Sequence, residues 1–551
     1  MPLELPNLSH LDSTDTWLHL GSRSIVEFLS NISGPKKLIF GPYVAKLYHH
    51  LVVIPTLKAL NCELAFLSRR LPDNVPESIV FFVYPDDDVI RDICSAIKSI
   101  QGLQRSYYFI FIGRFTGFQK EMMRSHTCEP DASHVLSVFD LPFIPLSSKL
   151  FVSPCPKSFM HIYCNGDQTK LWELGYSLTK YQADHGQTFS SVYTLGAHAE
   201  RLFDCMQFDS LSAANSDAGQ LLIVDRAVDY ANALKTQFSY GGCLAEYLGY
   251  NNLIMRVEKD VIPNQAMRDR LYAFNDLVFG DIWKLRFENV RKILKDKLNV
   301  WQAKMEETTQ SLQEAQDYKS RTDVMRSFTH QQDLSRTYLD KIGEHVALEQ
   351  HVFNEYIANE TFNELINFEL NLLDNYCEFE HIYDFMSTKT DPQVILRLVA
   401  MYCVILGGFD SVKMFNNFRK IFVRTYGYHH AFTLNNLQQA GLLFVRDKKQ
   451  KPFMDELLPD LCTQIHNGST LRLPKKLNLN VNNHRLREST ERRLTVFFLG
   501  GCTYDEYIAL DSLNIDLTII TTKLISTNTL IKEVFNQRND VLPEKISAIN
   551  M

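Results

Sequence analysis

The stretch "LLIVDRAVDYANALKTQFSY", residues 221–240, ends a short apolar run abruptly on an Asp-Arg pair. Such a run is typical of a buried parallel strand that ends at the carboxyl edge of an α/β sheet, where ligands and catalytic groups often lie. Asp225, Arg226 and Asp229 follow within five positions. The two aspartates could bind a metal ion for phosphoryl or glycosyl transfer, or Arg226 could pair with both and lock a structural corner. Mutual neutralisation favours the corner, because one arginine can reach both acids.

The sequence on either side of this strand has the alternation of an α/β protein. Residues 1–145 contain two helical stretches, at 43–60 and 86–100, between strand-like apolar runs: KKLIFG (36–41), CELAFLS (62–68), SIVFFVYP (78–85) and SYYFIFIG (106–113). This order predicts an open parallel sheet. A second α/β unit follows a proline-punctuated connector, with helices expected around 168–184 and 193–206 before the strand 220–225.

A long helical block separates this unit from the C-terminus. No proline lies between Pro263 and Pro392, and the composition there favours long helices with polar outer faces. The basic segment 467–493 is interpreted as a solvated loop, with contact to anionic lipid or an acidic partner through 471–493 as the alternative. Strand-like sequence returns at 493–501 and 516–522. We therefore expect two α/β open-sheet domains, with a large helical domain inserted in the second: 1–145, 146–245 plus 490–551, and 246–489.

The bulk composition excludes several classes of protein. A chain of 551 residues is too long for one core. Its net charge of −7 disfavours a sequence-independent grip on nucleic acid. The 11 cysteines are scattered without C-x-x-C spacing, and the N-terminal sequence does not resemble a signal peptide, so a reduced, cytoplasmic protein is expected. No apolar run approaches the ~20 residues that span a bilayer.

The common enzyme motifs are absent from the sequence. The pairs His49-His50 and His429-His430 cannot bind a metal alone, because adjacent helical residues point about 100° apart. Gly500 and Gly501 follow a strand and precede a helix, but no cation follows to neutralise a phosphate. A tight structural turn is therefore favoured, and no cofactor or metal is expected.

Taken together, these motifs resemble the paired signatures of the SM family, the Sec/Munc-like regulators of SNARE-driven membrane fusion. The first signature is matched by Asp225, Arg226, Asp229, Thr236, Gln237 and Tyr240, and the second by Gly500, Gly501, Thr503 and Glu506. A third segment, RTYGYHHAFTLNNLQQAGLL (424–443), is similar to the class C vacuolar-sorting branch, the thirty-three type, and the chain looks most like the animal B form. Gly241 and Ala245 depart from the acidic residues usual in the family.

The resemblance implies a three-domain arch, no enzymatic activity and an architectural role for the Asp-Arg-Asp corner. It implies partners among syntaxin-type and vesicle SNAREs, held by a helical hairpin at about 282–358. Within that hairpin, Leu339, Ile342, Val346 and Leu348 recur at helical spacing, which is more typical of a core than of a binding groove. Localisation is expected to be cytoplasmic, with indirect attachment to late endosome and lysosome membranes through partners.

The resemblance further implies that a tethering scaffold of the class C sixteen type docks on the helical domain, at about 390–489. The candidate contact residues are Tyr426, His430, Phe432, Leu434, Leu437 and Leu442. An excess of aromatic residues beside a turn glycine suits a protein interface, although some of these residues must pack internally. Two alternatives stay open: a scaffold-docked adaptor that does not handle SNAREs, and a nucleotide-dependent enzyme built on the α/β domains.

Overall fold

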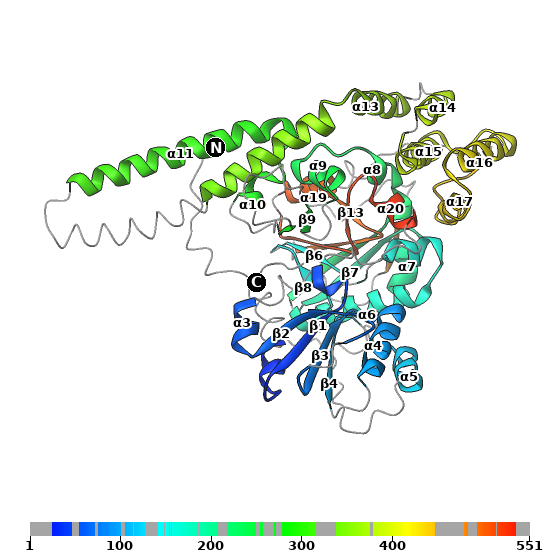
Figure 1. Ribbon diagram of the computed structural model, residues 1–551. Helices are drawn as coiled ribbons and strands as arrows, with labels where there is room; N and C mark the ends of the chain where they lie inside the picture. The colour runs from blue at the N-terminus through cyan, green and yellow to red at the C-terminus, as the bar shows by residue number, and fades with distance from the viewer. Residues whose placement is uncertain are drawn as a thin grey trace.

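The computed structural model shows a parallel four-stranded sheet, a seven-stranded sheet that is parallel except at its two edge strands, two small two-stranded sheets and a large set of helices (Figure 1). It describes residues 25–46, 54–71, 75–100, 105–113, 115–126, 142–147, 149–153, 155, 157–185, 187–206, 217–249, 254–256, 269–271, 278–314, 338–374, 378–388, 390–446, 479–482, 493–513 and 515–535.

The first sheet is parallel throughout, in the order β2-β1-β3-β4. Its strands are β1 (Lys36–Phe40), β2 (Cys62–Phe66), β3 (Ser78–Val83) and β4 (Ser106–Phe111). Every residue of β1 and β3 is buried, as expected for central strands of a parallel sheet covered on both faces. The accompanying helices are η2 (Val44–Lys46), α3 (Ile54–Ala59), α4 (Asp87–Ser99) and α5 (Gly117–His126).

The second sheet has the order β11-β7-β8-β12-β14-β6-β5. Its strands are β5 (Ile144–Pro145), β6 (Leu150–Val152), β7 (Gln187–Leu195), β8 (Asp217–Asp225), β11 (Leu479–Asn482), β12 (Leu494–Leu499) and β14 (Leu517–Thr521). β8 runs parallel to β12, with residues 220–225 opposite 494–499, so the C-terminal strands share a sheet with the middle of the chain. On this pairing we propose the same three domains, with the first boundary before Ile144, because β5 belongs to the second sheet.

Short elements join and cover the second sheet. They are η3 (Met160–Cys164), α6 (Gln168–His185), α7 (Ala197–Asp204), η4 (Arg226–Val228), α8 (Tyr230–Leu234), α9 (Tyr240–Tyr247), β13 (Cys502–Thr503), α19 (Tyr504–Asp511), β15 (Leu524–Ile525) and α20 (Thr529–Phe535).

Three sequence expectations for this region were wrong. The helix expected at 193–206 is shorter, because β7 occupies residues up to Leu195 and only α7 is helical. The predicted loop 467–493 contains β11, which pairs antiparallel with β7. A two-stranded antiparallel sheet of β9 (Ile254–Arg256) and β10 (Asp269–Leu271) lies in the predicted helical block. In each case a neighbouring strand supplies the backbone hydrogen bonds, which local sequence does not reveal.

The described part of the insertion is otherwise helical. Its elements are α10 (Phe279–Ile282), α11 (Phe287–Glu314), a helix that includes 338–352, η5 (Phe353–Ile357), α13 (Glu360–Leu373), α14 (Glu380–Ser387), α15 (Pro392–Leu406), α16 (Val412–Tyr426) and α17 (His430–Gln439). Figure 1 shows α11 and the 338–352 helix side by side, pointing away from the sheets, with α13 to α17 on the opposite side.

Two buried clusters connect the insertion to the second sheet. One packs α13 to α17 against one face, and includes Phe418, Leu434 and Phe497. The other packs the base of the hairpin against the opposite face, and includes Trp283, Leu348 and Val496. Among the described residues, none of the helices combines the length and apolar character needed to cross a membrane.

Candidate binding surfaces and the buried hub that positions them

Asp225 ends β8 and accepts hydrogen bonds on both carboxylate oxygens. The Tyr163 hydroxyl donates to Oδ1 at 2.6 Å, and the Ala227 amide donates to the same oxygen at 3.0 Å. The His198 amide donates to Oδ2 at 2.9 Å, and His198 Nδ1 lies 3.0 Å from Oδ2. Burial alone would raise the pKa of Asp225, but these bonds, led by that from His198, hold the pKa below its ordinary value of 3.8.

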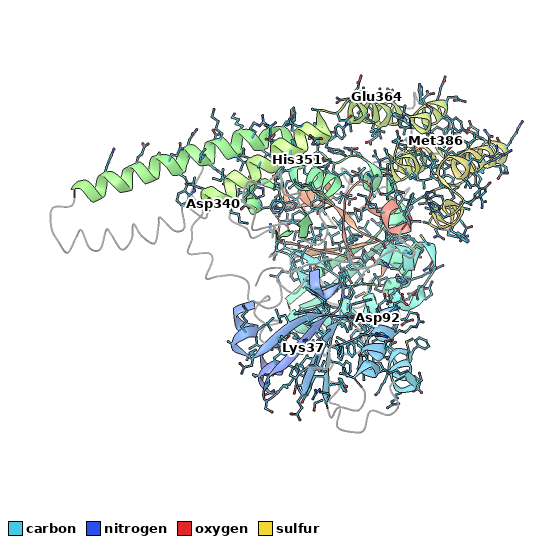
Figure 2. All side chains as sticks on the ribbon, viewed as in Figure 1. Lys37, Asp92, Asp340, His351, Glu364 and Met386 are labelled. Carbon is cyan, nitrogen blue, oxygen red and sulfur yellow. The ribbon has the colours of Figure 1, made fainter. Side chains whose placement is uncertain are left out.

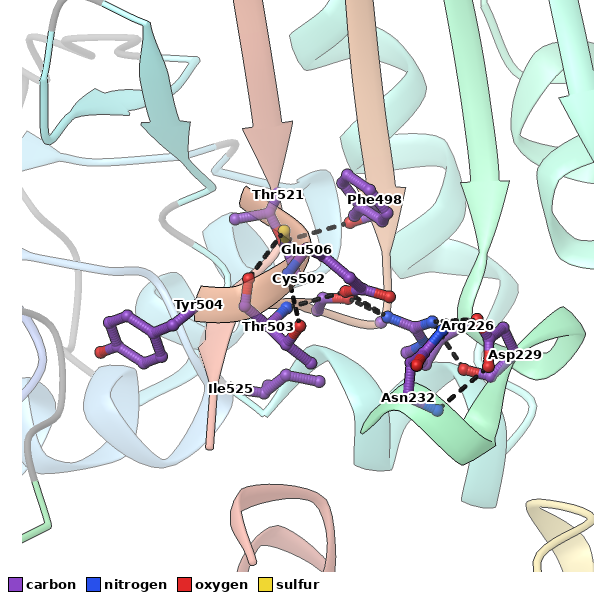
Figure 3. Close-up of polar contacts among 12 residues, drawn as sticks. Arg226, Asp229, Asn232, Phe498, Cys502, Thr503, Tyr504, Glu506, Thr521 and Ile525 are labelled. Atoms are coloured by element: carbon purple, nitrogen blue, oxygen red, sulfur yellow. Dashed lines mark hydrogen bonds and ion pairs between the residues drawn. The ribbon is translucent and has the colours of Figure 1, made fainter. Parts of the chain in front are cut away.

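Arg226 pairs with two acids, Asp229 three residues further along the chain and Glu506 on α19 (Figure 3). Its Nη1 lies 2.8 Å from Glu506 Oε2, and its Nη2 lies 3.9 Å from Asp229 Oδ2. Burial alone would lower the pKa of Arg226, but the attraction of Glu506 and Asp229 raises it, so the guanidinium stays charged. The expectation that Arg226 pairs with both neighbouring aspartates was therefore wrong for Asp225, whose side chain is already occupied.

Gly500, directly after β12, makes room for this arginine. Gly500 has a φ of +94°, and a Cβ there would lie 2.7 Å from the Arg226 Cβ. Thr503 then caps α19: its hydroxyl accepts from the Glu506 amide, while the Glu506 carboxylate accepts from the Thr503 amide. The same carboxylate oxygen, Oε2, also holds Arg226, so the turn and the corner form one network.

Thr236 connects the corner to the helical domain. Its amide and hydroxyl both donate to the Glu369 carboxylate on α13, at 3.0 and 2.7 Å. Arg397 on α15 pairs with the same carboxylate and donates to the Leu234 carbonyl at 3.0 Å. All four residues are buried, so the stretch before Tyr240 is hydrogen-bonded to two helices of the insertion.

Gln237 and Tyr240 make two more connections from the same stretch. The side chain of Gln237 accepts a hydrogen bond from the backbone amide of Tyr504 at 2.9 Å and donates one to the Ile525 carbonyl at 3.1 Å. The Tyr240 hydroxyl is hydrogen-bonded to Nδ1 of His345 in the second hairpin arm, at 3.1 Å. Residues 225–240 thus contact the second sheet, the C-terminal strands, α13 and the hairpin. We call them the hub.

The hub leaves no ligands free for the metal ion considered from the sequence. Both oxygens of Asp225 are occupied, and Asp229 accepts from the Asn232 amide at 3.1 Å and from its side chain at 2.6 Å. Across the described ranges, no three His, Cys, Asp or Glu side chains gather as a metal site would require. His49 and His50 lie outside the described residues.

Most of the hairpin stripe that the sequence treated as core does lie in the core, including Leu339, which is partly buried against it. Ile342 and Leu348 are buried in the hairpin base, but Val346 is 43% exposed. Phe353, in the π-helical turn η5 that follows, is 41% exposed, and the Arg291 guanidinium lies 5.8 Å from its ring centroid. We call Val346 and Phe353 the hairpin face. Figure 2 shows Asp340 and His351 labelled on the same arm.

The segment 424–443 divides into buried and exposed side chains. Of the candidate partner contacts, His430, Leu434, Leu437 and Leu442 are buried in the cluster beside the second sheet, so they cannot touch a partner directly. Tyr426 is half-buried, and its hydroxyl donates to the Thr390 carbonyl at 2.8 Å. Phe432 alone among the six is largely exposed, at 71%.

Sequence reasoning missed the most exposed aromatic residue of this segment. Tyr428, in the turn between α16 and α17, is 81% exposed. The exposed residues of α16 include the bases Lys413, Arg419, Lys420 and Arg424. α16 contains no acidic residue, a pattern that the sequence does display. We call Tyr428, Phe432 and these four bases the tip surface.

Comparison with known proteins identifies relatives over most of the chain. Residues 36–533 match the model of the Sec1 family. The vacuolar protein-sorting-associated protein 33 homolog of Arabidopsis thaliana is 24% identical over 454 residues, covering 78% of this chain and 72% of that protein. Form 33A of Rattus norvegicus is 24% identical over 584 residues, covering 92% and 94%. Form 33B of Homo sapiens is 22% identical over 509 residues, covering 86% and 78%. The similar identities leave the resemblance to the B form a prediction.

Solved structures show the same fold. The SM protein Vps45 in complex with the Qa SNARE Tlg2 superposes with a TM-score of 0.60 at 16% identity, covering 94% of this chain and 97% of that one. Unc18 in its complex with syntaxin 1 from Monosiga brevicollis gives a TM-score of 0.60 at 14% identity, covering 94% and 99%. The predicted fold class, an arch of two α/β domains with an inserted helical domain, is confirmed by this likeness.

Proposed function

Because the chain belongs to the Sec1 family, we propose that it binds SNARE proteins and regulates SNARE-driven fusion in vacuolar or endolysosomal sorting. Relatives over 92% and 86% of the chain are named vacuolar protein sorting-associated proteins. Two proteins of the same fold were solved in complex with a Qa SNARE and with syntaxin 1. The observation that carries the proposal on this chain is the exposed hairpin face on a helix fixed at its base.

The hairpin can work by holding helical segments close together. Its arms are linked near the base, where Arg291 Nε lies 2.9 Å from Glu349 Oε2, and farther out, where the Trp301 and Tyr338 rings are 4.8 Å apart. A SNARE segment that binds the hairpin face gives up its freedom before it meets a second segment. The four-helix assembly then begins with less loss of entropy, so the hairpin accelerates assembly by proximity.

The tip surface supports a second partner, a tethering scaffold of the class C sixteen type. Tyr428 and Phe432 provide exposed aromatic anchors beside four bases, a composition suited to an interface with an acidic or polar rim. Among the described residues, no ion pair involves any of the four bases. In this proposal the protein attaches to late endosome and lysosome membranes through its partners.

The proposal assigns the protein no catalytic step. The buried corner does not support a nucleotide-dependent enzyme, since hydrogen bonds from Tyr163, His198 and Ala227 occupy the carboxylate oxygens of Asp225. An adaptor that docks on the scaffold without handling SNAREs is the second candidate. The tip surface alone would suffice for that role.

A pull-down of the purified protein against a panel of endolysosomal SNARE motifs, with and without the scaffold fragment, tests the proposal. We expect capture of SNARE motifs by the wild-type chain and at least tenfold weaker capture by the Val346→Asp/Phe353→Asp variant. Leu370→Asp is the matched control, because Leu370 is 54% exposed on α13, outside the hairpin face. Capture of the scaffold without any SNARE would favour the adaptor.

A further inference from the structure

The hairpin is attached to the body of the protein through a short segment between α10 and α11. The Gly241 amide donates to the Trp283 carbonyl at 2.9 Å, and the Tyr240 amide donates to the Leu285 carbonyl at 2.8 Å. The Phe287 amide then donates to the Phe238 carbonyl at 2.9 Å. Residues 283–287 are therefore hydrogen-bonded along the end of the hub, where the direction of α11 is set.

Trp283 fills a socket at this point. Its side chain is 2% exposed, and its ring centroid lies 6.2 Å from that of Tyr504 at 75°, and 5.1 Å from that of Tyr507. A Cβ on Gly241 would lie 3.2 Å from the Trp283 carbonyl oxygen, 3.3 Å from its ring and 3.2 Å from the Tyr504 ring. The indole occupies this space because position 241 has no side chain.

The next residue, Lys284, attaches the same segment to α19 by charge. Its Nζ lies 2.5 Å from Asp511 Oδ2, and Lys149 Nζ lies 3.1 Å from Asp511 Oδ1. The ammonium group also lies 5.5 Å from the Trp283 ring centroid and 5.6 Å from that of Tyr507. Burial would raise the pKa of Asp511, but the two lysines hold it below its ordinary value, so the carboxylate stays charged.

We propose that Trp283, seated against Gly241 and the two α19 tyrosines, is the positioning residue that fixes the angle at which the hairpin leaves the body. The lever is long: 28 residues of α11 extend about 42 Å, so a tilt of about 10° at the base moves the far end by about 7 Å. A helical partner that contacts both the hairpin and the body can bind only if the position of the hairpin varies by less than this distance. The consequence of this angle for SNARE binding rests on the proposed function.

The angle can be measured without any SNARE, so the two proposals fail separately. Nitroxide labels are attached through a genetically encoded ketone amino acid at Gln310, near the far end of α11, and another at Arg201 on α7, since both positions are exposed. Pulsed electron paramagnetic resonance then gives the distribution of distances between the hairpin and the body. We expect one narrow distribution for the parent protein, and a shift or broadening of at least 5 Å in Trp283→Ala.

Trp283→Phe keeps an aromatic ring and should restore most of the parent distribution. Gly241→Leu is a second route to the same effect, because it pushes a side chain into the socket and leaves Trp283 in the sequence. Gly343→Leu is its matched control, since a Cβ at Gly343 meets nothing within 4 Å. Trp172→Ala, which removes a half-buried tryptophan from α6, controls for the loss of an indole.

An unchanged distribution in both Trp283→Ala and Gly241→Leu overturns the assignment. If Trp283→Ala does not fold, Gly241→Leu and Trp283→Phe decide the question alone. A shifted distribution with undiminished capture of SNARE motifs would support the anchor and contradict the hairpin's part in the proposed function.

Discussion

Arg226 and Glu506 are 280 positions apart in the sequence, yet guanidinium Nη1 and carboxylate Oε2 lie 2.8 Å apart. The two side chains are 1% and 2% exposed. One residue directly follows β8, before the helical insertion, and the other lies in the first turn of α19, after it. The pair thus closes the second sheet around the insertion, which explains why an enzyme-like Asp-Arg stretch occurs in a chain assigned a binding role.

Breaking this pair should destabilise the protein strongly. Arg226→Met leaves Glu506 charged and buried, and Glu506→Gln leaves the guanidinium without its nearest acid. We expect each variant to lose about 3–5 kcal/mol of unfolding free energy, measured by urea denaturation of the full-length protein. The double variant Arg226→Met/Glu506→Met should recover part of this loss, since no unpaired charge remains. Losses below about 1 kcal/mol in both single variants would show that the pair does not hold the sheet.

Asp225 should make stability depend on acid pH. Its folded-state pKa lies below the ordinary value of 3.8, because bonds led by that from His198 outweigh the effect of burial. The carboxylate's stabilisation is therefore complete above that value and is lost as pH falls through the folded pKa. Asp225→Asn should be less stable at neutral pH and should show a smaller decline in stability from about pH 5 to about pH 2. Asp88→Asn, at an exposed position, should keep the parent profile.

The contact between Tyr240 and His345 should hold the second hairpin arm to the hub. Tyr240→Phe keeps the ring but removes the hydroxyl, which lies 3.1 Å from Nδ1 and 3.4 Å from the carbonyl oxygen of His345, at a cost of about 1 kcal/mol. Hydrogen–deuterium exchange should rise in 338–352 and stay unchanged in β12 and β14. Tyr428→Phe, at an exposed turn, should leave the whole exchange pattern as in the parent. Equal exchange in the arm before and after Tyr240→Phe would count against this anchor.

The tip surface should bind the scaffold independently of the hairpin. Phe432→Asp places a charge at an exposed aromatic anchor and should weaken scaffold binding by at least tenfold, measured by isothermal titration calorimetry. Lys420→Glu/Arg424→Glu should weaken scaffold binding more at low salt than at high salt, as expected for exposed charges. Leu370→Asp is the surface control. Undiminished scaffold binding in Phe432→Asp would place that interface elsewhere.

The sequence predicted the elements whose patterns are local. The apolar run before Asp225 is a strand, and Gly500 and Gly501, both with positive φ, form the turn after β12 that the sequence favoured. The pairing of Arg226 with Asp229 was predicted, but its pairing with Glu506 in place of Asp225 could not be, because it depends on how Tyr163 and His198 occupy Asp225. Contacts made across the insertion leave no local signature.

The surfaces were predicted less well than the corner. The helical spacing of Leu434 and Leu437 indicates a face of α17, but not whether that face meets a partner or the second sheet. Only the tertiary packing shows that they are buried while Phe432 is exposed. Tyr428 lies in a turn without periodicity, so the sequence contained no signal that would rank it above its neighbours.

The most direct measurement is analytical ultracentrifugation of the protein with one syntaxin-type and one vesicle SNARE motif, which gives the stoichiometry of the complex. The account predicts a 1:1:1 complex for the wild-type chain, which Val346→Asp/Phe353→Asp loses while Val412→Asp, exposed on α16, retains it. A chain that binds neither motif, or a hairpin-face variant that binds both as the parent does, would contradict the claim that the hairpin holds SNARE segments together.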